Sequence, residues 1–350
     1  NDTCKLESGV EMKKALRKEY RTLSDEERAR FHKALNVLKA NGEYRKLSLL
    51  HQASTQGMAA HAGPAFLPWH REYMKRMEFA LRQVDPTLSQ PYWDSSLEAA
   101  LPNPADSILF TDLFIGTVEE DGRQVISGDF ATWKTMDGRP HIDRNVGIVG
   151  TGFQESNIDW VLDQAADDID NIFAYSEPED SCPLKNDSYI FNCLEYTHGV
   201  VHEFIGGDMN DTATASNDPI FYMHHTFIDY IWEAWRQEKQ TREQREEDYP
   251  TDKQACASPQ HFGAAPLEPF TPLRNNDGLS NAYTDNLFEY EPRPSCPECG
   301  NSKYLFCDNS HGLPRCSAKV RPGGICTGYV HKEPVCYEGE CKKGFCVSNA

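Results

Sequence analysis

Apolar side chains recur at helical spacing in several segments of the chain, and the first two lie before residue 90. Residues 23–39 begin with the capping-box pattern Ser24-Asp-Glu-Glu27 and carry one apolar face made by Phe31, Leu35 and Leu38. Residues 70–84 place an apolar face in register with His70, made by Tyr73, Met74, Met77, Leu81 and Val84. Asp85–Pro86 ends this segment, because the residue before a proline disfavours the helical conformation. We predict a helix in each segment.

Two further helices are predicted later in the chain. Residues 192–205 form a shorter segment that Gly206–Gly207 ends. Residues 218–238 form the longest one, which begins at Asp218–Pro219 with proline at the first helical position. It is apolar nearly all round, through Phe221, Tyr222, Phe227, Tyr230, Ile231, Trp232 and Trp235. We therefore expect this helix to be buried.

The predicted fold is mainly α, with long ordered loops. Glycine, proline and aspartate interrupt residues 101–158 too often for long elements, so we expect loops with short strands there. A chain of 350 residues is long enough for one large core and a small appendage.

The cysteines indicate where the appendage begins. Four of them, Cys4, Cys182, Cys193 and Cys256, are spread over the first 295 residues. The other eight follow the proline-rich residues 289–295: Cys296, Cys299, Cys307, Cys316, Cys326, Cys336, Cys341 and Cys346. We predict a core over residues 1–292 and a module over residues 293–350, which four disulfides hold together because so short a segment has little apolar core. The alternative, a zinc ribbon at Cys296-Pro-Glu-Cys299, lacks the second C-x-x-C that it needs.

Charge and cysteine usage limit the class of protein. The formal net charge of −19 repels phosphate backbones, so we expect no nucleic-acid partner. No apolar run is long enough to span a membrane. Twelve cysteines predict six disulfides, and sequons stand at Asn1, Asn186 and Asn210. With no apolar leader at Asn1, we expect a processed, secreted glycoprotein.

His198 and His202 are four residues apart in a predicted helix. This spacing leaves them about 40° apart around the axis and about 6 Å apart along it, so both imidazoles can reach one metal ion. The zinc-protease pattern requires glutamate directly after the first histidine, and here that residue is Gly199. Because such pairs are common on helix faces, a metal site needs a third histidine.

His224 and His225 are adjacent in the longest predicted helix. They point about 100° apart, so they cannot both face the same ion. We expect one to be a ligand and the other to lie beside the site or in a pocket wall. Asp229, one turn beyond His225, is expected to orient its imidazole, the alternative being an ordinary solvated acid. Neutral imidazoles without thiolate or carboxylate favour copper, with zinc as the alternative.

These residues and their neighbours resemble the tyrosinase family, which comprises tyrosinases, catechol oxidases and molluscan haemocyanin units with type 3 dicopper centres. The details resemble secreted invertebrate members most. The matching pieces follow the family order: His51, His61, Phe66-Leu-Pro-Trp-His-Arg71, Pro91-Tyr-Trp-Asp94, Leu194-Glu-Tyr-Thr-His198, His202, Gly206–Gly207, Asp218-Pro-Ile-Phe-Tyr-Met-His-His225, Asp229 and Trp232. The cysteine-rich tail lies outside the match.

The resemblance implies the metal ligands. It assigns His51, His61 and His70 to one copper ion and His198, His202 and His225 to the other, and it leaves His224 beside the site. The spacing from His51 to His61 varies within the family, so His32 is an alternative first ligand. The family fold is a four-helix bundle holding both ions, and the four predicted helices fit it, with His51 and His61 near the first pair.

Two positions depart from the pattern of many family members, and the second of them concerns relatives that hydroxylate monophenols. Some relatives crosslink a histidine to a cysteine two residues before the second ligand, where this chain has Ala59. In others an asparagine after the first ligand of the second copper, together with a glutamate, holds a proton-accepting water. Here Glu195 is present, but Gly199 replaces the asparagine. The resemblance therefore favours diphenol oxidation over monophenol hydroxylation.

The functional hypothesis is a secreted dicopper oxidase that converts catechols to o-quinones with O₂. Glu195 is the expected general base and His224 the second catalytic residue, the alternative for Glu195 being an ordinary helix-face carboxylate. Rival hypotheses are a haemocyanin-like oxygen carrier and a non-catalytic matrix protein. The C-terminal module is expected to pack at the side, with a matrix or protein partner or as a mere stabilising appendage, and the alternative is a plug over the copper site.

Overall fold

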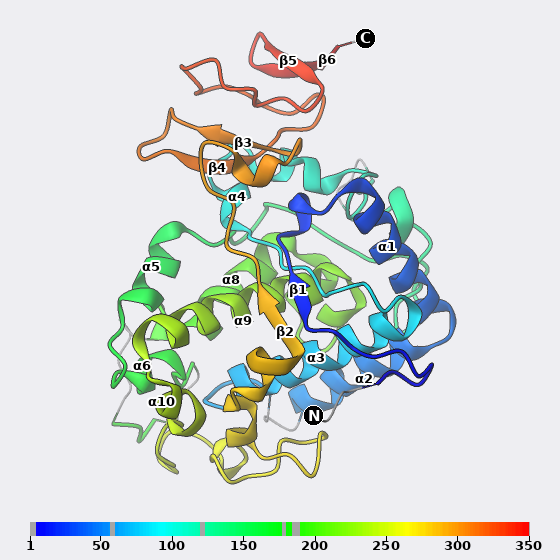
Figure 1. Ribbon diagram of the computed structural model, residues 1–350. Coiled ribbons are helices and arrows are strands. Elements are labelled where there is room, and N and C mark those ends of the chain that lie inside the picture. Colours follow the sequence, from blue (N-terminus) through cyan, green and yellow to red (C-terminus); the bar gives the residue numbers. More distant parts are fainter. Residues whose placement is uncertain (1–4, 57–59, 120–122, 177–179, 184–189, 350) are drawn as a thin grey trace.

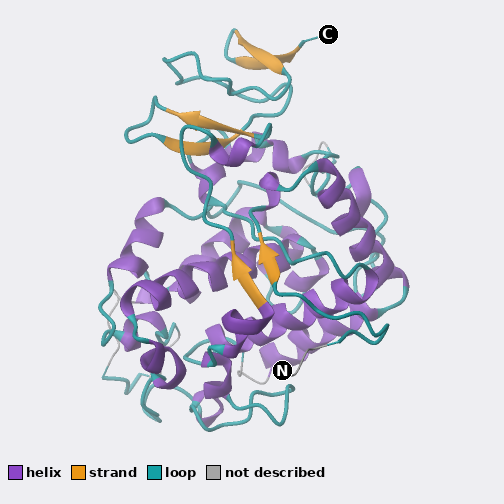
Figure 2. Ribbon diagram, in the orientation of Figure 1, coloured by secondary structure: helices purple, strands orange, loops and turns teal. Residues whose placement is uncertain are grey.

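Four helices meet at the centre of the molecule: α2 (Glu43–Gln56), α3 (Phe66–Val84), α8 (Leu194–Ile205) and α9 (Ile220–Lys239) (Figure 1). The computed structural model describes residues 5–56, 60–119, 123–176, 180–183 and 190–349. Helices and loops dominate the body of the molecule, and most strands lie in the C-terminal module (Figure 2). The predicted mainly α class with long ordered loops is confirmed.

All four predicted helices are present, but one helix of the central bundle, α2, was not predicted. α1 (Asp25–Ala40) begins at Ser24, whose side chain forms the predicted capping box with Glu27. Gly206 ends α8 with a φ of 66°, a conformation that glycine adopts without strain. However, His51 lies on α2, which was not among the predicted helices, and α1 packs against α2 and α3 without contributing a histidine to the centre. The helical spacing of Tyr44, Leu47 and His51 was the signal that could have indicated α2.

Short elements connect the long helices. They are α4 (Ser96–Ala99), α5 (Glu155–Asp163), α6 (Ile169–Ile172) and α10 (Arg242–Glu247). Within the described part of residues 101–158, the chain forms 3₁₀ turns and isolated bridges, such as Val118 with Val125, in place of the expected short strands.

A short parallel strand pair joins the beginning and the end of the core. β1 (Ala15–Arg17) pairs with β2 (Phe288–Tyr290), with Ala15 opposite Phe288. Arg17 is fully buried and donates hydrogen bonds to Glu78 of α3 (3.0 Å) and Asp229 of α9 (3.4 Å). The strand pair is therefore fixed to two of the four central helices.

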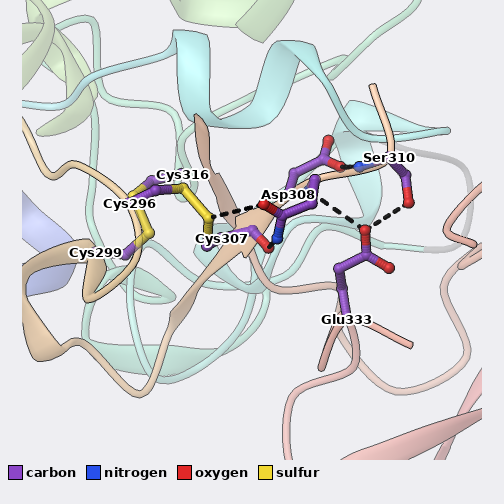
Figure 3. Close-up of a disulfide and its surroundings, with 8 residues drawn as sticks. Cys296, Cys299, Cys307, Asp308, Ser310, Cys316 and Glu333 are labelled. Atoms are coloured by element: carbon purple, nitrogen blue, oxygen red, sulfur yellow. Dashed lines mark hydrogen bonds between the residues drawn. A yellow bond between two sulfur atoms is a disulfide. The ribbon is translucent and has the colours of Figure 1, made fainter. Parts of the chain in front are cut away.

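Two antiparallel hairpins and four disulfides build the C-terminal module. β3 (Leu305–Asp308) pairs with β4 (Arg315–Ala318), and β5 (Gly339–Lys342) pairs with β6 (Phe345–Ser348). The disulfides are Cys296–Cys307, Cys299–Cys316, Cys326–Cys341 and Cys336–Cys346. Figure 3 shows the cysteines of the first two beside Asp308, Ser310 and Glu333. The four-disulfide prediction is confirmed, and both cysteines of the zinc-ribbon alternative are engaged in disulfides.

The prediction of six disulfides is met by five in the described part of the chain. The fifth, Cys182–Cys256, spans 74 residues within the core. Cys193 is buried and has a free thiol. Cys4 lies outside the described residues.

The module packs against one end of the core. The Tyr304 hydroxyl donates a 2.6 Å hydrogen bond to Asp25, and its ring meets the Phe114 ring edge-on at 4.7 Å. Leu97 and Leu101 of the core join the apolar cluster of the module. These contacts hold the module against α1 and α4, at one end of the molecule (Figure 1). The boundary at residue 293 stays a prediction.

Candidate metal centre

Three histidines from α2, α3 and the loop between them form the first triad. His51 lies on α2, His61 in the loop, and His70 near the beginning of α3. One ring nitrogen of each lies within 4.8 Å of the others. Their ring centroids are 5.1 Å apart for His61 and His70, and 5.2 Å for His51 and His61. The resemblance predicted these three histidines together.

The second triad comes from α8 and α9. His198, His202 and His225 also bring one ring nitrogen each within 4.8 Å of the others. The two helices hold these side chains because His198 and His202 share one face of α8, as their spacing predicted. The rings of His70 and His225 stack across the two triads, with centroids 4.2 Å apart and planes 12° apart. The triads therefore face each other in one buried space.

Backbone carbonyls orient three of the six imidazoles. His70 donates from Nδ1 to the Phe66 carbonyl (2.9 Å), and His202 donates from Nδ1 to the Met209 carbonyl (2.7 Å). His198 donates in the same way to the carbonyl of Glu195. A carbonyl oxygen only accepts, so Nδ1 carries the proton and Nε2 presents its lone pair. This fixed tautomer is the arrangement that metal-bound histidines use.

The donor set fits two metal ions. The Nε2 atoms of His202 and His225 lie 3.3 Å apart. Nitrogens bound tetrahedrally at metal distances of about 2.0–2.1 Å are separated by about 3.3 Å, so one ion can bind both atoms. Within the described residues, Nε2 of His70 and Nδ1 of His61 are buried and have no hydrogen-bond partner. A metal ion satisfies such atoms.

Burial keeps the imidazoles neutral, which metal binding requires. Desolvation lowers the pKa of His61 to about 3 and that of His202 to about 4. The pKa values of His51, His70, His198 and His225 are lowered well below the ordinary value, first by desolvation and then by neighbouring histidines.

His224 lies beside the second triad. Its Nε2 atom donates to the carbonyl of His198 (3.2 Å), and its ring is nearly parallel to the His198 ring, with centroids 5.6 Å apart. Trp93 and Phe153 contact its other sides. The side chain is fully buried, and it contacts both the backbone and the ring of His198.

The predicted contact between Asp229 and His225 is wrong. Asp229 instead accepts hydrogen bonds from Arg71 (2.6 Å) and from the Tyr290 hydroxyl. Arg71 follows His70 in α3, so this ion pair links the helices that carry His70 and His225. Periodicity within one helix could not reveal a partner 158 positions away in the chain.

His32, the alternative first ligand, lies away from both triads. His32 lies on the outer helix α1, where its ring nitrogens contact the Tyr20 hydroxyl (2.5 Å) and Asp129 (2.7 Å). His261 was not singled out from the sequence, yet its buried ring lies against Gly63 and near Ala65, in the loop before α3. No sequence motif marks His261.

A pocket of about 510 Å³ opens onto the histidines. Its wall includes the histidines His51, His61, His198 and His202 of both triads. Glu195 and Gly199 of α8 line the same pocket. The Oε1 atom of Glu195 accepts a 2.5 Å hydrogen bond from the backbone N–H of Ala62, next to His61. The described residues of the pocket wall lie between His51 and Thr212, so none of them comes from residues 293–350.

Two sequence predictions concern the surface. No helix among the described residues is long and apolar enough to cross a membrane. The sequon asparagine Asn210 is exposed, whereas Asn1 and Asn186 lie outside the described residues.

Comparison with known proteins agrees with the geometry. Residues 41–238 match the family model for the common central domain of tyrosinase. A tyrosinase-like protein of Caenorhabditis elegans is 52% identical over 345 residues, which is 98% of this chain and 48% of that protein. Tyrosinase-like protein 1 of Margaritifera margaritifera is 32% identical over 310 residues, 84% of this chain and 58% of that protein. The chain thus spans about half the length of these relatives.

Solved structures share the fold. A tyrosinase from Burkholderia thailandensis aligns with a TM-score of 0.53 at 17% identity, covering 80% of this chain and 74% of that one. A functional unit of octopus haemocyanin aligns with a TM-score of 0.52 at 19% identity, covering 79% of this chain and 68% of that one. The fold is therefore common to a tyrosinase and a haemocyanin unit.

Proposed function

This chain belongs to the tyrosinase family, and we propose that it is an oxidase that converts o-diphenols (catechols) to o-quinones with O₂ as the electron acceptor. The cofactor of the family is a dinuclear type 3 copper centre. The observation that carries the proposal is the open pocket of about 510 Å³ whose wall contains histidines of both triads. A substrate needs that access, whereas reversible O₂ binding does not.

The six histidines are the proposed ligands. His51, His61 and His70 would hold one copper ion, and His198, His202 and His225 the other. The bound pair supplies the electron transfer from catechol to O₂. The carbonyl oxygens that accept from Nδ1 of His70, His198 and His202 fix the direction in which each Nε2 lone pair points.

Glu195 is the proposed general base. Its carboxylate lies in the pocket wall, where it can take the proton of a substrate hydroxyl as electrons leave the ring. The alternative, an ordinary carboxylate on a helix face, fits less well because Glu195 is buried and anchors the loop of His61. Gly199 lines the pocket without a side chain, and a Cβ built there meets no atom within 4 Å. Nothing at this position holds a water beside Glu195, which favours diphenols over monophenols.

His224 is proposed as a positioning residue. It donates a hydrogen bond to the backbone of His198 and does not line the pocket, so it does not touch the substrate. Its expected effect is on the geometry of the second copper site.

Extracellular location, glycosylation and the domain boundary belong to the same proposal. Five disulfides fit an oxidising compartment, and Asn210, which is exposed and also lines the pocket, is the proposed acceptor for a glycan. The module over residues 293–350 is proposed as a side-packed accessory unit with a protein or matrix partner. Its contacts with Asp25 and Phe114 lie outside the pocket.

The test is turnover of a catechol in air by copper-loaded protein. Steady o-quinone formation, with elemental analysis giving two copper ions per chain, would support the proposal. A reversible O₂-binding spectrum without turnover would identify a haemocyanin-like carrier. Two bound copper ions with neither property would identify a non-catalytic protein, and zinc or a single copper ion in active protein would refute the site itself.

A further inference from the structure

One side of α8 forms a stripe along the pocket. Glu195, Gly199 and Glu203 are spaced four residues apart and all line the pocket, while His198 and His202 lie on the neighbouring face with their rings in the second triad. Residues at this spacing lie nearly above one another, with about 6 Å between successive members along the axis. The stripe thus presents a carboxylate, a gap and a second carboxylate.

The gap lies beside the histidines. Gly199 directly follows His198, and the space above its Cα is open. Tyr196 and Val200, which flank the stripe, add an aromatic and an aliphatic side chain to the wall. A flat phenolic ring that lies over Gly199, next to the second triad, can therefore contact the apolar side chains of Tyr196 and Val200.

The charged side chains in the described wall of the pocket are of one sign. Its described wall contains the carboxylates Glu195 and Glu203 and no lysine or arginine. Glu203 is exposed and forms no ion pair within the described residues. The chain as a whole carries a net charge of −19, so the rest of the molecule does not cancel the negative electrostatic potential at the opening of the pocket.

We propose that Glu203 selects catechols whose side chain carries a cationic amine, with the ring over Gly199 and the ammonium group beside the Glu203 carboxylate. This inference rests on the proposed oxidase activity and names its substrate class. The two-carbon arm of an arylethylamine fits the one-turn step of about 6 Å from Gly199 to Glu203. A catechol with a carboxylate on its arm meets repulsion at the same place.

The experiment compares three catechols: dopamine, neutral 4-methylcatechol and 3-(3,4-dihydroxyphenyl)propionate. Dopamine is expected to have the highest kcat/KM relative to 4-methylcatechol, and the propionate the lowest. Because an exposed ion pair is weak, Glu203→Gln should reduce the dopamine preference by about 2- to 5-fold, mainly through KM. Glu203→Lys should invert the order of dopamine and the propionate.

Two controls separate this effect from general charge. Glu243→Gln removes the same charge from an exposed position on α10 and should leave the preference intact. Raising the salt concentration should reduce the wild-type preference more than the residual preference of Glu203→Gln. Turnover of 4-methylcatechol with no dopamine preference, or with a preference that Glu203→Gln leaves unchanged, would overturn the inference. Absence of turnover with all three catechols would overturn the proposed function instead.

Discussion

The carboxylate of Glu195 accepts a 2.5 Å hydrogen bond from the backbone N–H of Ala62, which joins α8 to the loop that carries His61. One side chain thus reaches from the helix of the second triad to the residue that directly follows His61 of the first triad. Ala62 has a φ of 71°, a conformation uncommon for a residue with a side chain, so the loop benefits from an external anchor.

Two substitutions separate the anchor from the base. Glu195→Gln keeps an oxygen that accepts from Ala62 but cannot take a proton, so copper content should stay at two per chain while kcat for catechol falls by about 10²–10⁴. Glu195→Ala loses both roles and should also weaken copper binding at the His61 site. Copper analysis and steady-state kinetics check both. Full catechol activity in Glu195→Gln would show that Glu195 is not the base.

Adjacent histidines on α9 should behave differently. His225→Ala removes a ligand of the second triad, so about one copper ion per chain should remain and turnover should stop. His224→Ala removes no ligand but loses the hydrogen bond to the His198 carbonyl and the ring contacts with Trp93 and Phe153, so both ions should stay bound while kcat falls and the copper spectrum shifts. Elemental analysis after dialysis measures the difference. Equal copper loss in both variants would contradict the assigned roles.

Gly199 should set the balance between monophenols and diphenols. An asparagine side chain fits, because a Cβ at Gly199 meets no atom within 4 Å. Its amide can hold a water beside Glu195, and one hydrogen bond of this kind is worth roughly 1 kcal/mol, or about fivefold in rate. Gly199→Asn should therefore raise the monophenol rate by about that factor and leave the diphenol rate within twofold. Equal wild-type rates on tyrosine-like and catechol substrates would refute this explanation.

Acid should destabilise the metal-free protein through its buried histidines. The pKa is about 3 for His61 and about 4 for His202 in the folded chain, against about 6.5 for an unfolded histidine. Between these values the unfolded chain binds more protons, so the free energy of unfolding falls as the pH is lowered from about 7 to 4. Urea titrations of metal-free protein measure this slope.

A pair of variants tests whether the buried histidines of the metal centre cause the pH dependence of the unfolding free energy. His202→Asn should make the decrease in unfolding free energy smaller, because it removes one of the buried groups. His331→Asn changes an exposed histidine of the module and should leave the slope as it is in the wild type. The same slope in all three proteins would mean that other groups cause the acid sensitivity.

The sequence predicted local features better than long-range contacts. The capping box at Ser24, the end of α8 at Gly206 and the shared face of His198 and His202 all follow from short-range rules, and the structure contains them. The six histidines came from family resemblance, because spacing alone could not join triads from distant segments. The eight cysteines after residue 295 predicted four disulfides but not their pairing.

The missed features depend on partners far away in the chain. Asp229 pairs with Arg71 and not with His225, and Glu195 reaches Ala62, 133 positions away. His261 lies near Ala65 of the loop before α3 only because the chain returns there after α10. α2 was missed for a different reason, since its apolar face, with Tyr44 and Leu47, is short and ends at His51.

The most direct test of the central claim is O₂ consumption during catechol oxidation in a closed oxygen electrode. Oxidation of two catechols to o-quinones requires four electrons, which reduce one O₂ to two waters. Copper-loaded protein should therefore consume one O₂ for every two catechols over many turnovers, and His225→Ala should consume none. O₂ uptake that stops at one O₂ per chain, and is reversed when the gas is removed, would show an oxygen carrier and contradict the account.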